Sequence, residues 1–316
     1  MLIITNPIIG LIFAVRKAPL DSIELIKTIK QYSETHTLQK VIIGRYENYS
    51  EAPAYVELVN EDQKNGLPQK EQLKEEFDTF RQVLTEAGVE VLVPDYVGKF
   101  VYDQLTPRDL GMVIGEKFLL CNMVKKSRRY ESAGIFRYLH DIPGHEANII
   151  IPDSPTCFIE GGDILVDKGN IFVAVSQRTN QEGVAFLEEQ FGSEFNVVPV
   201  EARTLAEGEN VLHLDCMFNP VGGRAALIYE EGFKQVPREI LDNYDLIRVN
   251  KEQQRELATN ILSLSQDRII SRDHSLCKPI NEEIRKAGID VVEIKFDAAP
   301  ATGGSFRCCS LPLRRG

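Results

Sequence analysis

A pair of adjacent cysteines near the end of the chain is the first feature that could carry chemistry. Cys308 and Cys309 come directly after Arg307 and a few residues after Gly303-Gly304. Glycines allow close approach to the backbone, and a neighbouring arginine favours the thiolate form of a cysteine if the two side chains meet. A thiolate is a nucleophile, whereas a buried cysteine is more often a small apolar side chain. Both interpretations stay open, with Cys308 the better candidate nucleophile.

A histidine and a carboxylate two residues apart form a second candidate. In the stretch 211–215, strand alternation would place His213 and Asp215 on one polar face and Leu212 and Leu214 on the opposite, apolar face. Such a histidine serves either as a general acid and base or in a satisfied structural pair. We therefore expect a strand here and keep both roles open.

Two further carboxylates, Glu160 and Asp163, flank the pair Gly161-Gly162. Gly-Gly turns with solvated acids are common. The apolar residues on either side argue for burial instead, and a buried carboxylate needs a cationic or hydrogen-bonding partner. A cationic ligand would serve, so Asp163 is a candidate substrate-binding group. Asp109, which stands just before another apolar run, is a weaker candidate of the same kind.

Neither a metal site nor a redox cofactor is expected from the sequence. His140 and His145 lie five residues apart on no shared helical face, and we assign them no role. The six cysteines are scattered apart from one adjacent pair, which suits neither a disulfide framework nor a zinc knuckle. We expect reduced thiols in a cytoplasmic protein that uses no metal and no cofactor.

The elements that must position these groups recur along the chain. A helical pattern at 70–87 runs into an apolar strand at 89–93, and strands of similar character start at Asn148, Asn196, Leu246 and Val291. Helical patterns are plainest before two of these strands, at 181–191 and 281–286. The similar spacing of the strand starts suggests a five-fold internal repeat.

Short hairpins fall between these units, most clearly where strands at 164–167 and 171–176 surround the turn Lys168-Gly169-Asn170. The predicted cycle is therefore strand, strand, helix, strand. A doubly wound α/β sheet is the alternative, although the opening stretch 3–7 leads into no Gly-rich phosphate loop. No stretch is typical of a linker, so we expect one domain over residues 1–316, with a long polar surface excursion at 47–70.

Composition limits the classes of partner. The 316 residues include 36 Lys plus Arg and 47 Asp plus Glu, for a net charge of −11, and no basic run is longer than a pair. This balance argues against a nucleic-acid groove and against docking to an anionic membrane surface. The apolar start at 1–15 has no basic leader, so we expect neither a signal peptide nor a membrane span. Homo-oligomerisation stays open.

Six short motifs together resemble the guanidino-group-modifying enzymes, the superfamily of arginine deiminase, dimethylarginine dimethylaminohydrolase and the amidinotransferases. They stand in the family's order over roughly residues 103–314. The motifs are Pro107-Arg108-Asp109, Arg128-Arg129-Tyr130-Glu131, Ile159-Glu160-Gly161-Gly162-Asp163, Ser176-Gln177-Arg178-Thr179-Asn180, His213-Leu214-Asp215 and Arg307-Cys308-Cys309-Ser310. The resemblance implies a five-bladed α/β propeller of ββαβ units with pseudo-five-fold symmetry, which agrees with the repeat.

The resemblance also implies a role for each matching residue. Cys308 becomes the nucleophile, His213 the general acid and base, and Glu160 the carboxylate that orients His213. Asp109 becomes a ligand of the substrate guanidinium, and Asp215 a second one. Arg178, and less directly Arg128, are implied to hold the carboxylate of the substrate.

These residue types suit an attack on a guanidinium carbon, a poor electrophile that requires a thiolate and fixed carboxylates. We expect a hydrolase that acts on arginine or a methylated or related arginine through a covalent thiouronium. The same site with an amine in place of water is an amidinotransferase, so this alternative stays open. The alternative from another class is a non-catalytic propeller that binds a protein partner.

Overall fold

The computed structural model describes residues 28–49, 67–98, 101, 104–209 and 211–316. The apolar start at 1–15 and most of the polar excursion expected at 47–70 lie outside these residues. None of the described helices combines the length and the apolar character that a membrane span requires.

The described strands form five mixed sheets of three strands each. In every sheet the middle strand pairs antiparallel with the first strand and parallel with the third. In this first, middle and third order, the strands are β3 (Gly111–Ile114), β4 (Lys117–Leu120) and β5 (Ile149–Ile150); β6 (Ile164–Asp167), β7 (Asn170–Val175) and β8 (Asn196–Glu201); β9 (Phe218–Val221), β10 (Ala225–Ile228) and β11 (Asp245–Arg248); β12 (Leu262–Ser265), β13 (Arg268–Arg272) and β14 (Asp290–Ile294); and β15 (Ser310–Arg315), β1 (Leu38–Ile43) and β2 (Glu90–Leu92).

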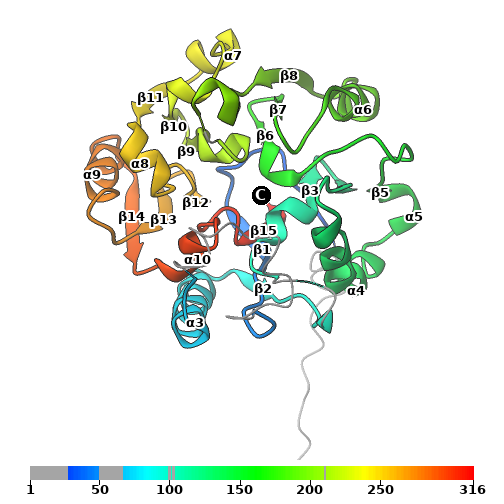
Figure 1. Ribbon diagram of the computed structural model, residues 1–316, viewed down its shortest axis with the longest axis horizontal. Coiled ribbons are helices and arrows are strands. Elements are labelled where there is room, and N and C mark those ends of the chain that lie inside the picture. The colour runs from blue at the N-terminus through cyan, green and yellow to red at the C-terminus, as the bar shows by residue number, and fades with distance from the viewer. Residues whose placement is uncertain (1–27, 50–66, 99–100, 102–103, 210) are drawn as a thin grey trace, which may run out of the picture.

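Figure 1 shows the five sheets around a common centre with most helices on the outside. A parallel pair requires a crossover connection, and helices occupy that connection in every sheet. These connecting helices are α3 (Lys70–Glu86), α4 (Phe136–His140) with α5 (His145–Asn148), α6 (Gln181–Phe191), α7 (Arg238–Leu241) and α9 (Lys278–Lys286). Two further helices, α8 (Lys251–Arg255) and α10 (Ala298–Ala301), lie in connections between sheets.

Local sequence signals account for the best-defined elements. Helix α6 begins after Asn180, whose side chain accepts a hydrogen bond of 3.1 Å from the backbone N–H of Gly183 and so caps the helix. The hairpin between β6 and β7 turns at Lys168 and Gly169, whose φ angles are 49° and 72°. Positive φ at both central residues is the requirement of a tight type I′ turn.

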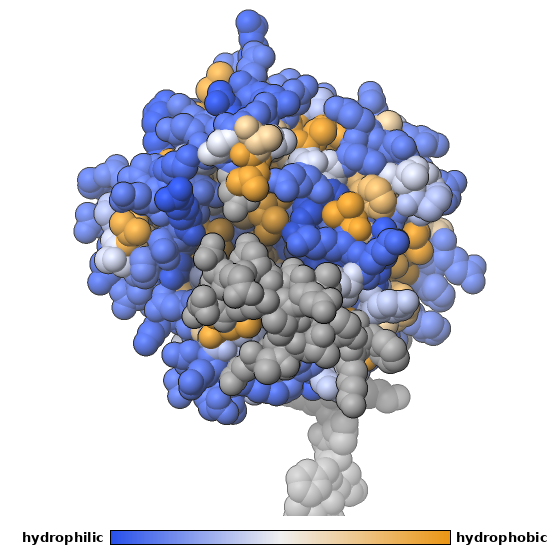
Figure 2. Space-filling view, in the orientation of Figure 1, coloured by the Kyte–Doolittle hydropathy of each residue, from blue (hydrophilic) through white to orange (hydrophobic). Residues whose placement is uncertain are grey.

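The apolar core is divided among the sheets. The described buried side chains form five clusters, and each cluster joins residues of two neighbouring sheets. For example, the rings of Phe172 in β7 and Phe218 in β9 lie 5.4 Å apart, edge to face. On the face shown in Figure 2, hydrophobic residues form only separate patches. Each sheet is therefore held in place by both of its neighbours.

The predicted α/β class and the order strand, strand, helix, strand are confirmed, and α6 has the predicted bounds. The doubly wound alternative is wrong, because the strands form five separate mixed sheets. The strand expected at 211–215 is also wrong. His213 instead precedes a 3₁₀ turn, η7 (Leu214–Cys216), because the Cys216 N–H bonds to the His213 carbonyl and the Leu214 N–H donates to Asp163.

Candidate active site

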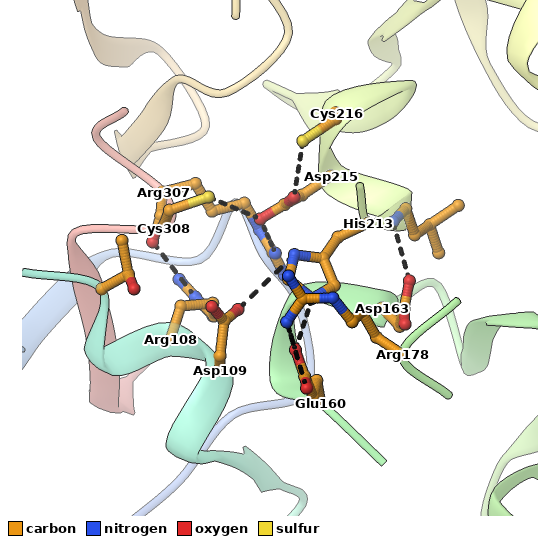
Figure 3. A network of polar contacts seen from close by, with 12 residues as sticks. Arg108, Asp109, Glu160, Asp163, Arg178, His213, Asp215, Cys216, Arg307 and Cys308 are labelled. Carbon is orange, nitrogen blue, oxygen red and sulfur yellow. Dashed lines mark hydrogen bonds and ion pairs between the residues drawn. The ribbon is translucent and has the colours of Figure 1, made fainter. Parts of the chain in front are cut away.

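Five segments of the site come from equivalent places in the five sheets. Each lies just before the first strand of a sheet, and Figure 1 shows these first strands innermost. Arg128 and Arg178 instead follow the middle strands β4 and β7. The segments are η3 (Pro107–Leu110) before β3, η5 (Gly161–Asp163) before β6, η7 before β9, residues 259–261 before β12 and residues 306–309 before β15. The repeat therefore brings together side chains that are far apart in the sequence (Figure 3).

His213 lies between two carboxylates. Its Nε2 is 2.8 Å from Oε2 of Glu160, and its Nδ1 is 3.7 Å from Oδ1 of Asp109. All three side chains are buried. Burial alone would lower the pKa of His213, but the carboxylates outweigh it, Asp109 most of all, and raise this pKa to about 10. The imidazole is therefore protonated at neutral pH and can act as an acid.

Gly162 makes the approach of Asp109 to His213 sterically feasible. A Cβ atom at this position would lie 2.7 Å from Oδ1 of Asp109 and 2.8 Å from Nδ1 of His213. Carbon atoms do not come this close to polar atoms without displacing them. The glycine predicted to allow a turn therefore has a second use, because it leaves room for the side chains of Asp109 and His213.

The two arginines expected to hold a substrate carboxylate instead contact protein carboxylates. Nη1 of Arg128 lies 2.7 Å from Oδ2 of Asp109, and its Nε lies 2.8 Å from Glu131. Nη1 of Arg178 lies 3.0 Å from Oε2 of Glu160. Although burial opposes ionisation, His213 and these arginines lower the pKa values of Asp109 and Glu160, so both acids are charged.

Asp163 connects two of the segments. Its Oδ2 accepts a hydrogen bond of 2.7 Å from Ser176 Oγ, and its Oδ1 accepts one of 3.1 Å from the Leu214 N–H. Burial raises its pKa to about 6. The prediction that Glu160 and Asp163 are buried rather than solvated is confirmed, and both Asp163 oxygens already have donors within the protein.

Cys308 lies among polar groups. Its Sγ is 3.6 Å from Oδ2 of Asp215 and 3.1 Å from Nδ2 of Asn260. Contact with the Cys216 thiol, burial and the Asp215 charge together raise the pKa of Cys308 well above its usual value. The thiol is therefore protonated in the substrate-free protein.

The expectation that Arg307 favours the thiolate through contact with the sulfur is not met in the structure. Its Nη1 donates to Asp215 at 2.9 Å, and its Nη2 donates to Glu34 at 3.0 Å. Arg307 thus acts on the carboxylate beside Cys308 rather than on the thiol. Cys309, by contrast, packs into an apolar cluster that includes Phe306, as expected for the non-nucleophilic cysteine.

Asn260 and Glu34 were not identified from the sequence. Neither belongs to a recognisable motif, and each contacts its partner across the fold rather than along the chain. The signal that could have found Asn260 is positional, because it stands just before the first strand of its sheet, as Asp109, His213 and Cys308 do before theirs.

Asp109, Glu160 and His213 could together offer three metal ligands, since their ligand atoms lie within 4.8 Å of one another. Arg128 and Arg178, however, already neutralise the two carboxylates, which disfavours a divalent cation there. The expectation of no metal stays a prediction. A cavity of about 550 Å³ between α3 and α10 contains none of these residues, so the chemistry of the side chains, not cavity size, marks the site.

A family model and a relative in another organism both match most of the chain. Residues 50–315 match the family described as N,N dimethylarginine dimethylhydrolase, eukaryotic. The chain is 34% identical over 289 residues to the uncharacterized protein YkgA of Bacillus subtilis (strain 168), covering 90% of this chain and 94% of that protein.

Solved structures share the fold at lower identity. SxtG, an amidinotransferase of Microseira wollei from the saxitoxin biosynthetic pathway, superposes with a TM-score of 0.78 at 19% identity, over 91% of this chain and 97% of SxtG. The dimethylarginine dimethylaminohydrolase of Pseudomonas aeruginosa, solved with citrulline, has a TM-score of 0.69 at 20% identity, over 87% of this chain and 99% of that chain.

Proposed function

The chain belongs to the eukaryotic N,N dimethylarginine dimethylhydrolase family, within the guanidino-group-modifying superfamily, and from that premise we propose a cysteine-dependent hydrolase of a small arginine-like substrate. It acts on the guanidinium of arginine or of a methylated or related arginine and forms a covalent thiouronium. We interpret the five sheets as the blades of a five-bladed α/β propeller with pseudo-five-fold symmetry.

One observation carries this proposal. Oδ1 of Asp109 and Nδ1 of His213 face each other at 3.7 Å, both are buried, and neither has a hydrogen-bond partner among the described residues. Buried polar atoms cost free energy unless they are hydrogen-bonded. We therefore interpret the space beside these two atoms as a binding site for a ligand. A carboxylate oxygen beside a proton-carrying imidazole suits a guanidinium that must bind and then receive a proton.

The first half of the reaction breaks a C–N bond. A guanidinium on Asp109 adds positive charge near Cys308, which offsets the carboxylates that oppose ionisation of the thiol. The Cys308 thiol then loses its proton to solvent water, and the thiolate sulfur forms a bond to the guanidinium carbon. His213 gives its proton to the departing amine nitrogen, the C–N bond breaks, and an S-alkyl thiouronium remains on Cys308.

The second half consumes water. His213, now neutral, takes a proton from a water molecule while the oxygen attacks the thiouronium carbon. The C–S bond then breaks and returns its electron pair to Cys308, and the added hydroxyl group gives its proton to the sulfur, which leaves a ureido product and the Cys308 thiol. Glu160, at 2.8 Å from Nε2, holds the ring so that Nδ1 faces Asp109 throughout.

The second candidate is an amidinotransferase, because an amine acceptor in place of water uses the same residues. Incubation of the protein with arginine, methylated arginines and agmatine, each with and without glycine, lysine or ornithine, separates the two. Ureido product without an acceptor supports the hydrolase, and an amidinated acceptor supports the transferase. Absence of turnover with every combination would contradict both the hydrolase and the amidinotransferase. The remaining hypothesis would then be a non-catalytic propeller that binds a protein partner.

The substrate series also tests the two arginines. We propose that Arg178 and Arg128 exchange their present carboxylate partners for the carboxylate of the substrate. Agmatine, which lacks that carboxylate, is then the poorest substrate of the series. Equal turnover of agmatine and arginine would contradict this role without affecting the assignment of Cys308.

A further inference from the structure

Asn260 contacts the candidate nucleophile with both ends of its side-chain amide. Its Oδ1 accepts a hydrogen bond of 3.0 Å from the backbone N–H of Cys308, and its Nδ2 donates to the Cys308 sulfur at 3.1 Å. Its backbone carbonyl accepts a third bond, of 3.3 Å, from the N–H of Arg307. Asn260 is fully buried and lies 48 residues before Cys308 in the sequence.

An amide N–H is a pure donor, and a thiolate is a much stronger acceptor than a thiol. The bond from Nδ2 therefore gains strength when Cys308 loses its proton. We propose that Asn260 stabilises the thiolate of Cys308 and fixes the direction of its sulfur; this inference rests on the proposed function, in which that sulfur attacks the guanidinium.

The other neighbours of the Cys308 sulfur oppose loss of its proton, so the thiolate requires a group that stabilises it. Asp215 presents a carboxylate oxygen at 3.6 Å, and the Cys216 thiol lies against the same carboxylate at 3.5 Å. Both groups favour the protonated sulfur. Among the residues that the structure describes, the Asn260 amide is the only nitrogen donor at hydrogen-bonding distance from Sγ.

The amide is also held in position before any substrate binds. Nδ2 of Asn219, in β9, donates to the carbonyl of Thr259 at 2.8 Å and to the carbonyl of Ile261 at 3.0 Å. These two hydrogen bonds fix the backbone on either side of Asn260. A donor fixed in this way costs little reorganisation when charge develops on the sulfur.

The test is the pH dependence of alkylation of Cys308 by iodoacetamide, followed by mass spectrometry of the intact, full-length protein. Asn260→Ala should move the inflection to higher pH by about one to two units, because a hydrogen bond to a charged group is lost. Asn260→Asp keeps an oxygen for the Cys308 N–H but replaces the donor with an acid. It should move the inflection at least as far.

Asn281→Ala is the matched control. Asn281 is also fully buried, accepts from Ser271 and donates to the Arg272 carbonyl, but does not contact the site. It should lower stability and leave the alkylation profile unchanged.

An unchanged profile in folded Asn260→Ala, or an equal shift in Asn281→Ala, overturns the inference. If Asn260→Ala fails to fold, the profile of Asn260→Asp decides in the same way. Because alkylation requires no substrate, absence of turnover in the unaltered protein would defeat the proposed function and leave this measurement standing.

Discussion

Two buried ionic clusters lie close together in this protein, and they are arranged in opposite ways: two carboxylates flank an imidazole in one, and three arginines surround a carboxylate in the other. The cluster that we propose to be catalytic, called the catalytic cluster below, consists of Asp109, Glu160 and His213 with the two arginines that contact them, Arg128 and Arg178. In the central cluster, three arginines surround one carboxylate: Arg108, Arg307 and Arg315 around Glu34.

The pKa values of His213, Arg108 and Arg315 reflect these different surroundings, whereas Glu34 and Asp215 raise the pKa of Arg307. In the catalytic cluster, carboxylates raise the pKa of His213 to about 10. In the central cluster, burial and the neighbouring guanidinium groups lower the pKa of Arg108 to about 9, and burial lowers that of Arg315 to about 10. The catalytic cluster holds a titratable proton, whereas the central cluster holds more positive charge than its carboxylate can balance.

The two clusters also differ in the buried polar atoms that have no hydrogen-bond partner among the described residues. Those of the catalytic cluster are one carboxylate oxygen and one imidazole nitrogen, which can receive a cationic ligand. The unbonded atoms of the central cluster are all guanidinium nitrogens, at Arg108, Arg307 and Arg315. Other nitrogens of these arginines donate to backbone carbonyls, as Arg315 does to His36 and Ser263 and Arg307 does to Ile164. We therefore interpret the first cluster as part of the proposed reacting site and the second as an anchor for the segments around it, with the Arg307–Asp215 bond as the connection between them.

The largest effect is expected at Cys308, the proposed nucleophile, which lies beside Asp215. Cys308→Ser should lower turnover by about four orders of magnitude or more, because a hydroxyl ionises far less readily than a thiol. The fold should persist, since a hydroxyl can take the same contacts with Asn260 and Asp215. Turnover, thermal unfolding and mass spectrometry of the thiouronium adduct measure this. Near-normal turnover in the variant would remove Cys308 from the mechanism.

The central cluster should respond in stability rather than in chemistry. Glu34→Gln removes the carboxylate that three buried arginines share, of which Arg307 alone keeps a second one, Asp215, and should cost about 3–5 kcal/mol in urea unfolding. The control is Glu230→Gln, which removes an exposed ion pair with Arg248 and should leave the unfolding midpoint unchanged. Equal behaviour of the two variants would show that the central cluster is not a structural anchor.

The protonated state of His213 provides a pH test of the catalytic cluster. Because its pKa rises from 6.5 to about 10 on folding, its ionic contacts stabilise the protein fully below pH 6.5, and this stability is lost as pH rises through about 10. Asp109→Asn removes the carboxylate that raises this pKa most. The loss of stability should then occur at lower pH.

NMR titration of the His213 imidazole measures this directly. The matched control is Asp95→Asn, an exposed acid paired with Arg137, which should not move the His213 titration. A His213 pKa that is the same in Asp109→Asn as in the unaltered protein would show that Asp109 does not set the charge of the imidazole.

The repeated elements could be predicted because their signals are local. The bounds of α6 follow from a capping asparagine and a helical period, and the β6–β7 hairpin follows from its turn residues. The strand expected around His213 was wrong because the deciding contact, from the Leu214 N–H to Asp163, comes from a distant segment. The alternation of polar and apolar residues at 211–215 contains no information about such a distant partner.

In the candidate site, too, the residues with local sequence signals could be predicted, and the contacts between distant segments could not. The types and order of the motif residues pointed to Cys308, His213 and Glu160, and the structure brings His213 within hydrogen-bonding distance of Glu160. The present partners of Arg128 and Arg178 depend on the packing of η3 and η5 and could not be derived from spacing. Asn260 contacts Cys308, which precedes the first strand of another sheet, so only the place of Asn260 in the repeat connects it to the site.

The smallest effect is expected at Cys309, which lies in neither ionic cluster. Its side chain packs in the apolar cluster with Phe306, so Cys309→Ser places a hydroxyl among apolar groups and should cost about 1–3 kcal/mol. Turnover should persist, because the variant leaves the contacts of Cys308 with Asp215 and Asn260 in place. The measurements are turnover and urea unfolding beside Cys308→Ser. If Cys309→Ser is folded but inactive while Cys308→Ser is active, the assignment of the nucleophile is displaced by one residue, and the role given to Asn260 falls with it.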